Sequence, residues 1–254
     1  MFLTNAIGTM RRLRLRDVQE PDQVIEQTAL PGLYWIRNYY LRTGEHSRIV
    51  LPNPGQGAFT AVYHAHDFTE SAHGGYDMYG IHMGQVDVLT FLAADARRMS
   101  GHFVDCRENS PTLHQEARLE FGGDPDRALV IERGIAHIFD NLTCMVTMNQ
   151  MRLFMDWGNP DFDPNIDVLN VARGTPPDQF PVVRINRYRA PRWICALAVK
   201  MQRIQLRKGI GNHHPFKFKL NGRRYTLTPV QGVGALAPYD YDGKASAVKT
   251  SPLA

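Results

Sequence analysis

The stretch Ser110-Pro111-Thr112, followed by Glu132-Arg133-Gly134-Ile135-Ala136-His137-Ile138-Phe139, decides the fold that we expect for this chain. Polar turn residues and the apolar run Leu129-Val130-Ile131 lie between the two stretches. Short apolar runs separated by turns are typical of β-strands. Gly134 permits a sharp turn that residues with a Cβ adopt poorly. His137 then falls on the next strand, where side chains alternate between two faces, so we expect it to line a small-molecule pocket inside a β-barrel.

The same pattern extends from about residue 30 to residue 173, where apolar runs alternate with turn signals such as Pro52-Asn53-Pro54-Gly55 and Gly122-Gly123-Asp124-Pro125. Many short strands at this spacing predict an all-β sandwich or barrel, and a jelly roll is the version we expect. The 254 residues suffice for one large core with an appendage. No run reaches the roughly 18–20 apolar residues that a membrane-spanning helix needs.

The turn-rich sequence Gly174-Thr175-Pro176-Pro177-Asp178 indicates a linker. We expect an N-terminal arm over residues 1–27, a β-barrel domain over 28–175 and a basic extension over 176–254. The extension contains 14 Lys and Arg and 3 acidic residues, a balance of +11. The remainder has 29 − 14 = 15 basic and 25 − 3 = 22 acidic residues, a balance of −7. This asymmetry suggests two functional regions.

The extension is expected to hold a helix over about 191–208, with Pro191 near its first turn and an apolar stripe beside basic residues. A β-hairpin over about 216–227 is indicated by Asn221-Gly222, a typical type I′ turn, and a disordered end follows. We expect the apolar stripe to pack on the acidic barrel. Contact with an anionic surface is the alternative, and no nucleic-acid partner is expected.

The three cysteines, Cys106, Cys144 and Cys195, are scattered, form no CxxC motif and are odd in number. Reduced thiols are therefore the expected state. The Arg-rich residues 1–17 are not followed by the apolar segment of a secretory signal. We accordingly expect a cytoplasmic protein.

Two further motifs accompany the opening stretch: Val104-Asp105-Cys106-Arg107 directly before it, and Gly80-Ile81-His82 upstream. Together with the Ser-Pro-Thr and Gly-x-Ala-His-x-Phe patterns, they resemble the dTDP-4-dehydrorhamnose 3,5-epimerase family of the RmlC-like cupins. Residues 57–63 and 67–70 are similar to its Gly-x-Phe strand and the Asp-Phe that follows. The resemblance covers roughly residues 29–173. It implies a jelly-roll cupin that forms homodimers by exchanging N-terminal strands.

The resemblance also implies roles for two histidines. His82 matches the general base that removes the proton α to the ketone of the sugar, and His137 matches the histidine that helps to hold the enolate oxygen. An imidazole suits such work because its pKa lies near neutrality. This chemistry requires no cofactor. We therefore expect an epimerase- or isomerase-like enzyme acting on a carbonyl-containing small molecule, a sugar nucleotide or a specialised metabolite.

Several pocket positions depart from the pattern of the family. The nucleotide-binding arginine of the family falls at Gln56, the glutamate at Ala61 and a second arginine at Tyr79. Its lysine falls near Thr90, and the tyrosine that acts as its acid falls near Thr147. Its aspartate partner of the base falls near Leu169 or Asn170. The expected substrate-binding residues are Phe59, Gln56, Tyr79, Thr147 and Asn149.

Two alternatives use the same barrel. His64-Ala65-His66 with Glu70 and His137 resembles the ligand set of metal-binding cupins, since a His-x-His pair places both rings on one face of a strand. This predicts an iron, manganese or zinc centre and an oxygenase-like activity. The other alternative is a non-catalytic, ligand-binding cupin.

Overall fold

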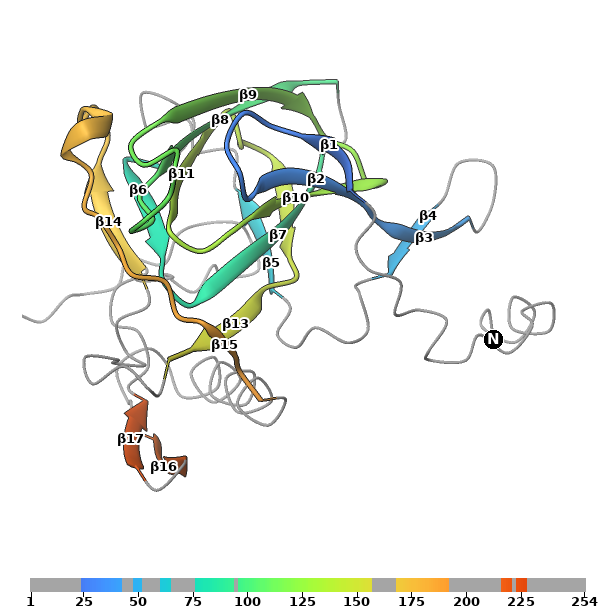
Figure 1. Ribbon diagram of the computed structural model, residues 1–254. Coiled ribbons are helices and arrows are strands. Elements are labelled where there is room, and N and C mark those ends of the chain that lie inside the picture. The colour runs from blue at the N-terminus through green and yellow to red at the C-terminus, as the bar shows by residue number, and fades with distance from the viewer. Residues whose placement is uncertain are drawn as a thin grey trace, which may run out of the picture. The chain divides into compact units, whose positions relative to one another are not determined.

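A computed structural model of the chain (Figure 1) describes residues 24–42, 48–51, 60–64, 76–93, 96–156, 168–191, 216–220 and 223–227. Several expected features lie outside these residues: Gln56, Phe59, His66, Glu70, Cys195 and the helix expected over about 191–208, of which only the first residue is described. Within the described residues, no helix is long and apolar enough to cross a lipid bilayer.

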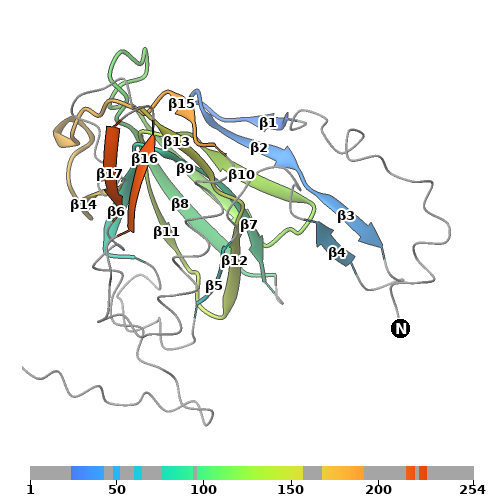
Figure 2. The same cartoon turned by 90° about the horizontal axis from the view of Figure 1, so that it is seen from below.

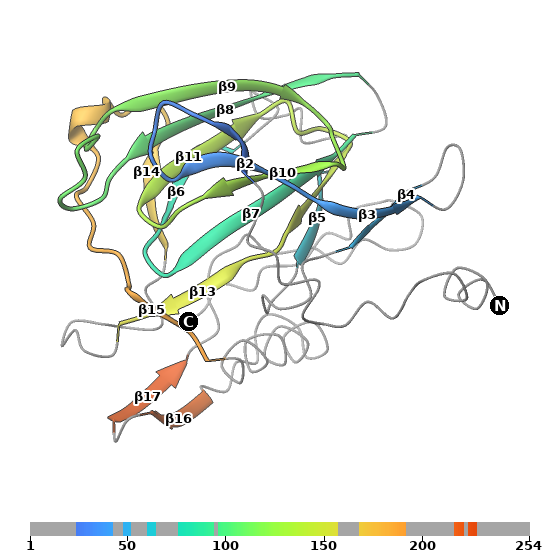
Figure 3. The ribbon, with the colours of Figure 1, turned by 45° about the vertical axis from the view of Figure 1, so that its right-hand side comes forward.

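The larger sheet is antiparallel, and most of its neighbouring strands do not follow one another in the sequence. Its strands lie in the order β1 (Val24–Gln27), β2 (Leu33–Arg37), β10 (Arg127–Ile131), β7 (Gln85–Leu92), β12 (Met145–Asn149) and β5 (Thr60–His64). β13 (Arg152–Met155) pairs with the start of β7 and with β15 (Tyr188–Arg189), as Figure 3 shows. β7 and β10 thus form the middle of this sheet.

The second sheet is also antiparallel and lies opposite the first (Figure 2). Its strands lie in the order β14 (Val168–Ala172), β6 (Met78–His82), β11 (Ile135–Asp140), β8 (Arg98–Asp105) and β9 (Glu116–Gly122). The chain passes from one sheet to the other at each step from β5 through β8, and again at each step from β9 through β12. This crossing of strands between two antiparallel sheets confirms the expected all-β jelly roll.

The core fills the space between the sheets, because the strands alternate apolar side chains toward it. β2, β7 and β10 contribute Trp35, Phe91 and Leu129, and the second sheet contributes Phe103 and Phe139, all of them buried. Phe91, Phe121 and Phe139 contact one another with tilted or edge-on rings, the geometries that aromatic pairs prefer. The core therefore fixes which faces of β7 and β11 point inward.

The outer face of the second sheet is covered by residues that follow β14. Phe180 and Val183 pack against the outward side chains Tyr79, Ile81 and Ile138. A short 3-10 helix, η3 (Pro177–Gln179), precedes Phe180, and Val183 exchanges backbone hydrogen bonds with the segment after β8. Residues 177–190 thus return to the barrel, although the sequence places the domain boundary before them. The expected division of the chain stays a prediction.

Two separate hairpins complete the described elements. β3 (Tyr39–Arg42) pairs with β4 (Arg48–Leu51). β16 (Phe216–Leu220) pairs with β17 (Arg223–Leu227), at the residues where the sequence predicts a hairpin around Asn221-Gly222. β16 and β17 belong to a second compact unit that spans Lys200–Ala254.

Candidate active site

Three strands bring polar side chains to the inner face of the barrel at one end of the core. On β11, Ile135 and Phe139 belong to the core, so His137 between them faces the same way. On β7, Leu89 and Phe91 face the core and Asp87 lies two residues earlier on the same face. On β6, Tyr79 and Ile81 face outward, which turns His82 inward.

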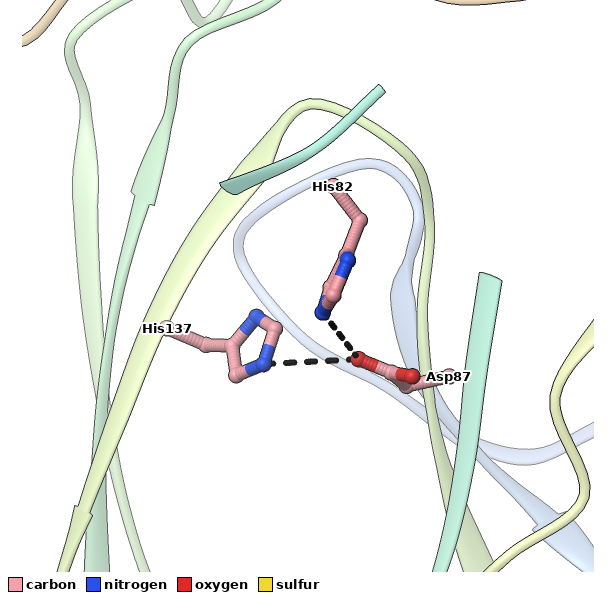
Figure 4. Close-up of side chains that lie close together, drawn as sticks. All are labelled: His82, Asp87 and His137. Carbon is pink, nitrogen blue, oxygen red and sulfur yellow. Dashed lines mark ion pairs between the residues drawn. The ribbon is translucent and has the colours of Figure 1, made fainter. Parts of the chain in front are cut away.

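The two histidines converge on one carboxylate oxygen of Asp87 (Figure 4). Nε2 of His82 lies 3.7 Å and Nε2 of His137 lies 3.3 Å from Oδ2 of Asp87. The two imidazole rings stack, with centroids 5.7 Å apart and 30° between their planes. The Asp87 side chain is buried, whereas those of His82 and His137 keep 22% and 13% of their exposure. Solvent or a small ligand can therefore reach the rings.

Neighbouring amides hold the Asp87 carboxylate in a single orientation. Its Oδ1 accepts hydrogen bonds from Nε2 of Gln85 at 2.6 Å and from Nδ2 of Asn149 at 2.7 Å. The amide of Asn149 is itself oriented, because its Oδ1 accepts the backbone N–H of Val88 at 3.1 Å. Oδ2 is left to face the two histidines. Asn149, an expected substrate-binding residue, thus reaches the site as the support of Asp87.

His137 lies in surroundings that disfavour its positive charge. Burial lowers the pKa of His137, and the neighbouring His82 lowers it further, while Asp87 and the Ile135 carbonyl act in the opposite direction. Its Nδ1 lies 3.2 Å from that carbonyl oxygen, which can only accept a hydrogen bond. Nδ1 therefore carries a proton, and Nε2 is the nitrogen that faces Asp87.

The turn before β11 links the two histidines through the backbone. Gly134 adopts a φ of 76°, and its N–H donates a 2.7 Å hydrogen bond to the carbonyl oxygen of His82. Its own carbonyl accepts the N–H of Cys106. A Cβ on Gly134 would meet Cγ of Arg107 at 2.5 Å. Only glycine satisfies both the left-handed conformation and this close approach.

The Ser-Pro-Thr motif supports the same region without entering the site. The hydroxyls of Ser110 and Thr112 each donate to Oδ2 of Asp105 at 2.6 Å, and Arg107 binds both carboxylate oxygens. Burial by itself would raise the pKa of Asp105, but these hydrogen bonds outweigh it and bring the pKa to about 2. The motif forms a clamp around the buried Asp105, which holds Arg107 against the turn at Gly134.

Other residues expected in the pocket lie elsewhere. Tyr79 is on the outer face of the second sheet, with its hydroxyl bonded to Nδ1 of His102, and so lies on the opposite face from His82 and His137. Thr147 faces inward one strand beyond Asp87 and contacts Nε2 of His64 at 3.0 Å. His64 is buried and also meets the ring of Tyr76. Of the alternative metal ligands His64, His66, Glu70 and His137, the structure describes only His64 and His137, because His66 and Glu70 lie outside the described residues.

Asp87 is the member of this cluster that the sequence patterns missed. The lysine of the resembled family was aligned with Thr90, which points to the outer side of β7 and accepts a hydrogen bond from Asn38. Of the two positions aligned with its aspartate, Leu169 packs in the outer cluster, and Asn170 pairs with Gly80 on β6. One signal was present: Asp87 is the single charged residue in the strand Gln85–Leu92. A carboxylate in such an apolar strand is costly to bury unless it is paired.

Comparisons with known proteins point to one group of solved structures. No protein-family model and no curated protein matches the chain. The Mycobacterium tuberculosis rmlC epimerase is 14% identical over 50% of this chain and 66% of its own, less than two thirds, with a TM-score of 0.36. The RmlC 3,5-epimerase of Legionella pneumophila, solved with dTDP-4-keto-L-rhamnose, is 16% identical over 66% of this chain and 87% of its own, with a TM-score of 0.40.

A dTDP sugar isomerase from Desulfovibrio desulfuricans is 15% identical over 59% of this chain and 89% of its own, with a TM-score of 0.40. These structures belong to the kind of enzyme that the sequence motifs resemble. The fold assignment itself rests on the strand order and the core described above.

Proposed function

We propose that the chain is an enzyme that transfers a proton at the carbon next to a carbonyl group, with His82 as the base. The observation that supports this proposal is the buried carboxylate of Asp87, whose Oδ2 lies 3.7 and 3.3 Å from Nε2 of two inward-facing imidazoles. A histidine that takes a proton becomes positively charged, and a nearby carboxylate stabilises that charge. Asp87 would fill this role from β7.

The reaction follows from these positions. Nε2 of His82 would accept the proton, and the electrons of the broken C–H bond would move onto the carbonyl oxygen to form an enolate. His137 would donate from Nε2 to this oxygen in its doubly protonated form, since its Nδ1–H is engaged with Ile135. Burial disfavours that charged form, and the Asp87 carboxylate beside Nε2 acts in its favour. Return of the proton from the same or the opposite side then gives exchange or epimerisation. The substrate class, a ketosugar nucleotide or similar metabolite, rests on the resemblance of the motifs.

Solvent exchange tests the proposal. Protein in D2O is mixed with dTDP-4-keto-L-rhamnose or a simple hydroxyketone, and NMR follows the loss of the C–H signal next to the carbonyl. We expect exchange with the native chain and a loss of about 10²–10⁴-fold in His82→Ala, the usual contribution of a general base. His102→Ala removes a histidine from the outer face of the same sheet and serves as the control. Exchange that persists in His82→Ala would contradict the proposal.

Two associated expectations remain predictions. The motifs imply a homodimer, which light scattering on the purified chain measures directly. A contact of the basic residues 176–254 with an anionic surface is measured by sedimentation with vesicles of anionic lipid, using a chain that ends at residue 199 as the comparison. Binding of the full chain alone would support that contact.

A further inference from the structure

We propose that His82, Asp87 and His137 bind one divalent transition-metal ion, of the class of Zn²⁺, Mn²⁺ or Fe²⁺. Nε2 of each ring and Oδ2 of the carboxylate are the ligand atoms. The three atoms lie within 4.8 Å of one another and come from three strands, β6, β7 and β11. This set differs from the one that the sequence suggested, in which only His137 is shared.

The spacing of the atoms suits a shared ion better than direct hydrogen bonds. The nitrogen-to-oxygen distances of 3.3 and 3.7 Å exceed the 2.7–2.9 Å of an ordinary charge-assisted hydrogen bond. Ligands that each lie about 2.0–2.2 Å from one ion are roughly 3.0–3.5 Å apart when the angle at the ion is near tetrahedral or octahedral. The distance from His137 to Asp87 falls in this range, and that from His82 is slightly longer.

The hydrogen bonding of His137 directs a lone pair into the site. With the proton on Nδ1 held by the Ile135 carbonyl, Nε2 of the neutral ring has a free electron pair that points at a carboxylate oxygen. Two electron-rich atoms that face each other repel unless a positive charge lies between them. A backbone carbonyl on the far nitrogen is also the usual second partner of a metal-bound histidine.

Asp87 is likewise prepared as a ligand. Gln85 and Asn149 hold Oδ1, so Oδ2 is the oxygen that remains for an ion. Since the Asn149 amide is fixed by the N–H of Val88, this support is rigid. Two imidazoles and one carboxylate suit zinc, iron or manganese, whereas calcium and magnesium prefer sites made of oxygen ligands. Three protein ligands leave further positions for water or a carbonyl oxygen of a substrate.

This inference does not rest on the proposed reaction, and the two make different demands on His82. A ring whose Nε2 lone pair binds an ion cannot accept a proton with the same pair. We therefore expect added metal to suppress the exchange that His82 performs and a chelator to restore it. Metal binding is measured without any substrate, so its outcome is separate from that of the exchange assay.

The test uses the full chain, treated with chelator and then dialysed. Zn²⁺ is titrated by calorimetry and Co²⁺ by its visible absorption, which reports the ligand geometry. We expect one ion per chain. Asp87→Asn keeps the size of the side chain and should abolish the absorption bands, as should His137→Ala. Asn149→Ala leaves every ligand atom in place and should weaken binding about 10–100-fold through loss of support. His102→Ala should bind as the native chain does.

Two results would overturn the inference. One is the absence of stoichiometric binding to the native chain. The other is binding that survives in Asp87→Asn and His137→Ala but disappears in the double variant His64→Ala/His66→Ala, which would place the ion with the other histidines. Near-ultraviolet circular dichroism of each variant distinguishes loss of the site from loss of the fold. The Asn149→Ala variant tests the site independently, because it keeps all three ligand side chains and changes only the support of Asp87.

Discussion

The N–H of Gly134 donates a hydrogen bond of 2.7 Å to the carbonyl oxygen of His82. This bond joins the last residue of β6 to the turn that begins β11, three residues before His137. The two histidines therefore share one backbone support, although 55 positions separate them (137 − 82 = 55). The side chain of Arg107, held by Asp105, packs directly over the turn. The geometry of the site thus depends on a glycine and a clamp that lie outside it.

Gly134→Ala should lower the free energy of unfolding by more than the cost of placing alanine in a left-handed backbone conformation. An alanine at a φ of 76° costs about 1–2 kcal/mol, and its Cβ would also clash with Cγ of Arg107 at 2.5 Å. We expect a further loss of about 1–3 kcal/mol from that overlap. Urea unfolding of the variant measures the total.

Gly174→Ala is the matched control, because Gly174 has a φ of 86° but no atom within 4 Å of an added Cβ. It should show the conformational cost only. Equal losses of unfolding free energy in the two variants would mean that the close approach of Arg107 to the turn is unimportant.

The clamp around Asp105 should make stability depend on acid. The pKa of Asp105 is about 2 in the folded chain, against an ordinary 3.8. Because the folded value lies below the unfolded one, the contribution of the carboxylate is fully present above about pH 4 and is lost as the pH falls toward 2. The shift corresponds to about 2 kcal/mol. When the free energy of unfolding is measured between pH 6 and pH 2, protonation of Asp105 should account for this amount of the total decline.

Asp105→Asn should remove that part of the pH dependence while lowering stability at neutral pH. Asp178→Asn, at an exposed position in η3, removes one carboxylate without disturbing the clamp. If Asp105→Asn and Asp178→Asn retained the same acid sensitivity, the clamp would not be its source.

Phe103→Ala should cost about 3–5 kcal/mol, the range for truncating a buried phenylalanine. Phe103 is completely buried, pairs with His137 across the strands and packs edge-on against Phe139. Thermal unfolding measures the loss. Val182→Ala, at a position 53% exposed, should change stability little. A small loss in Phe103→Ala would show that the core collapses into the space.

The two described cysteines should differ in reactivity. Burial raises the pKa of Cys106 to about 12, so its thiol does not ionise at neutral pH, whereas Cys144 is exposed. In a Cys195→Ser background, a disulfide reagent should modify one thiol quickly in the native chain and the second only after unfolding. Rapid modification of both would show that the segment after β8 opens readily.

The jelly roll was predictable because its strands and turns depend on patterns of residues that are close together in the sequence. The alternation of Ile135, His137 and Phe139 against Ala136 and Ile138 fixes which side of β11 faces the core. Gly134 marks the turn, and its positive φ confirms the reason for a glycine there. The structure shows that the same alternation turns both His82 on β6 and His137 on β11 to the inner face.

The partners of the histidines could not be read from the sequence. Asp87 meets His137 only because β7 and β11 lie in facing sheets, and Asn149 reaches Asp87 only through the pairing of β12 with β7. A shift of one residue on β7 would turn Asp87 outward, as the alignment with Thr90 illustrates. Tyr79 faces the outer side of the second sheet for the same reason, since it alternates with the inward positions of β6.

The sequence by itself therefore determined the strands, their turns and the inward histidines, all of which depend on residues close together in the chain. Tertiary structure decided that a carboxylate from β7 joins those histidines and that Ser110 and Thr112 serve Asp105 rather than a ligand. The physical reason is that strand register and sheet packing set contacts between distant segments. Such registers are selected by the burial of the whole core and not by any one motif.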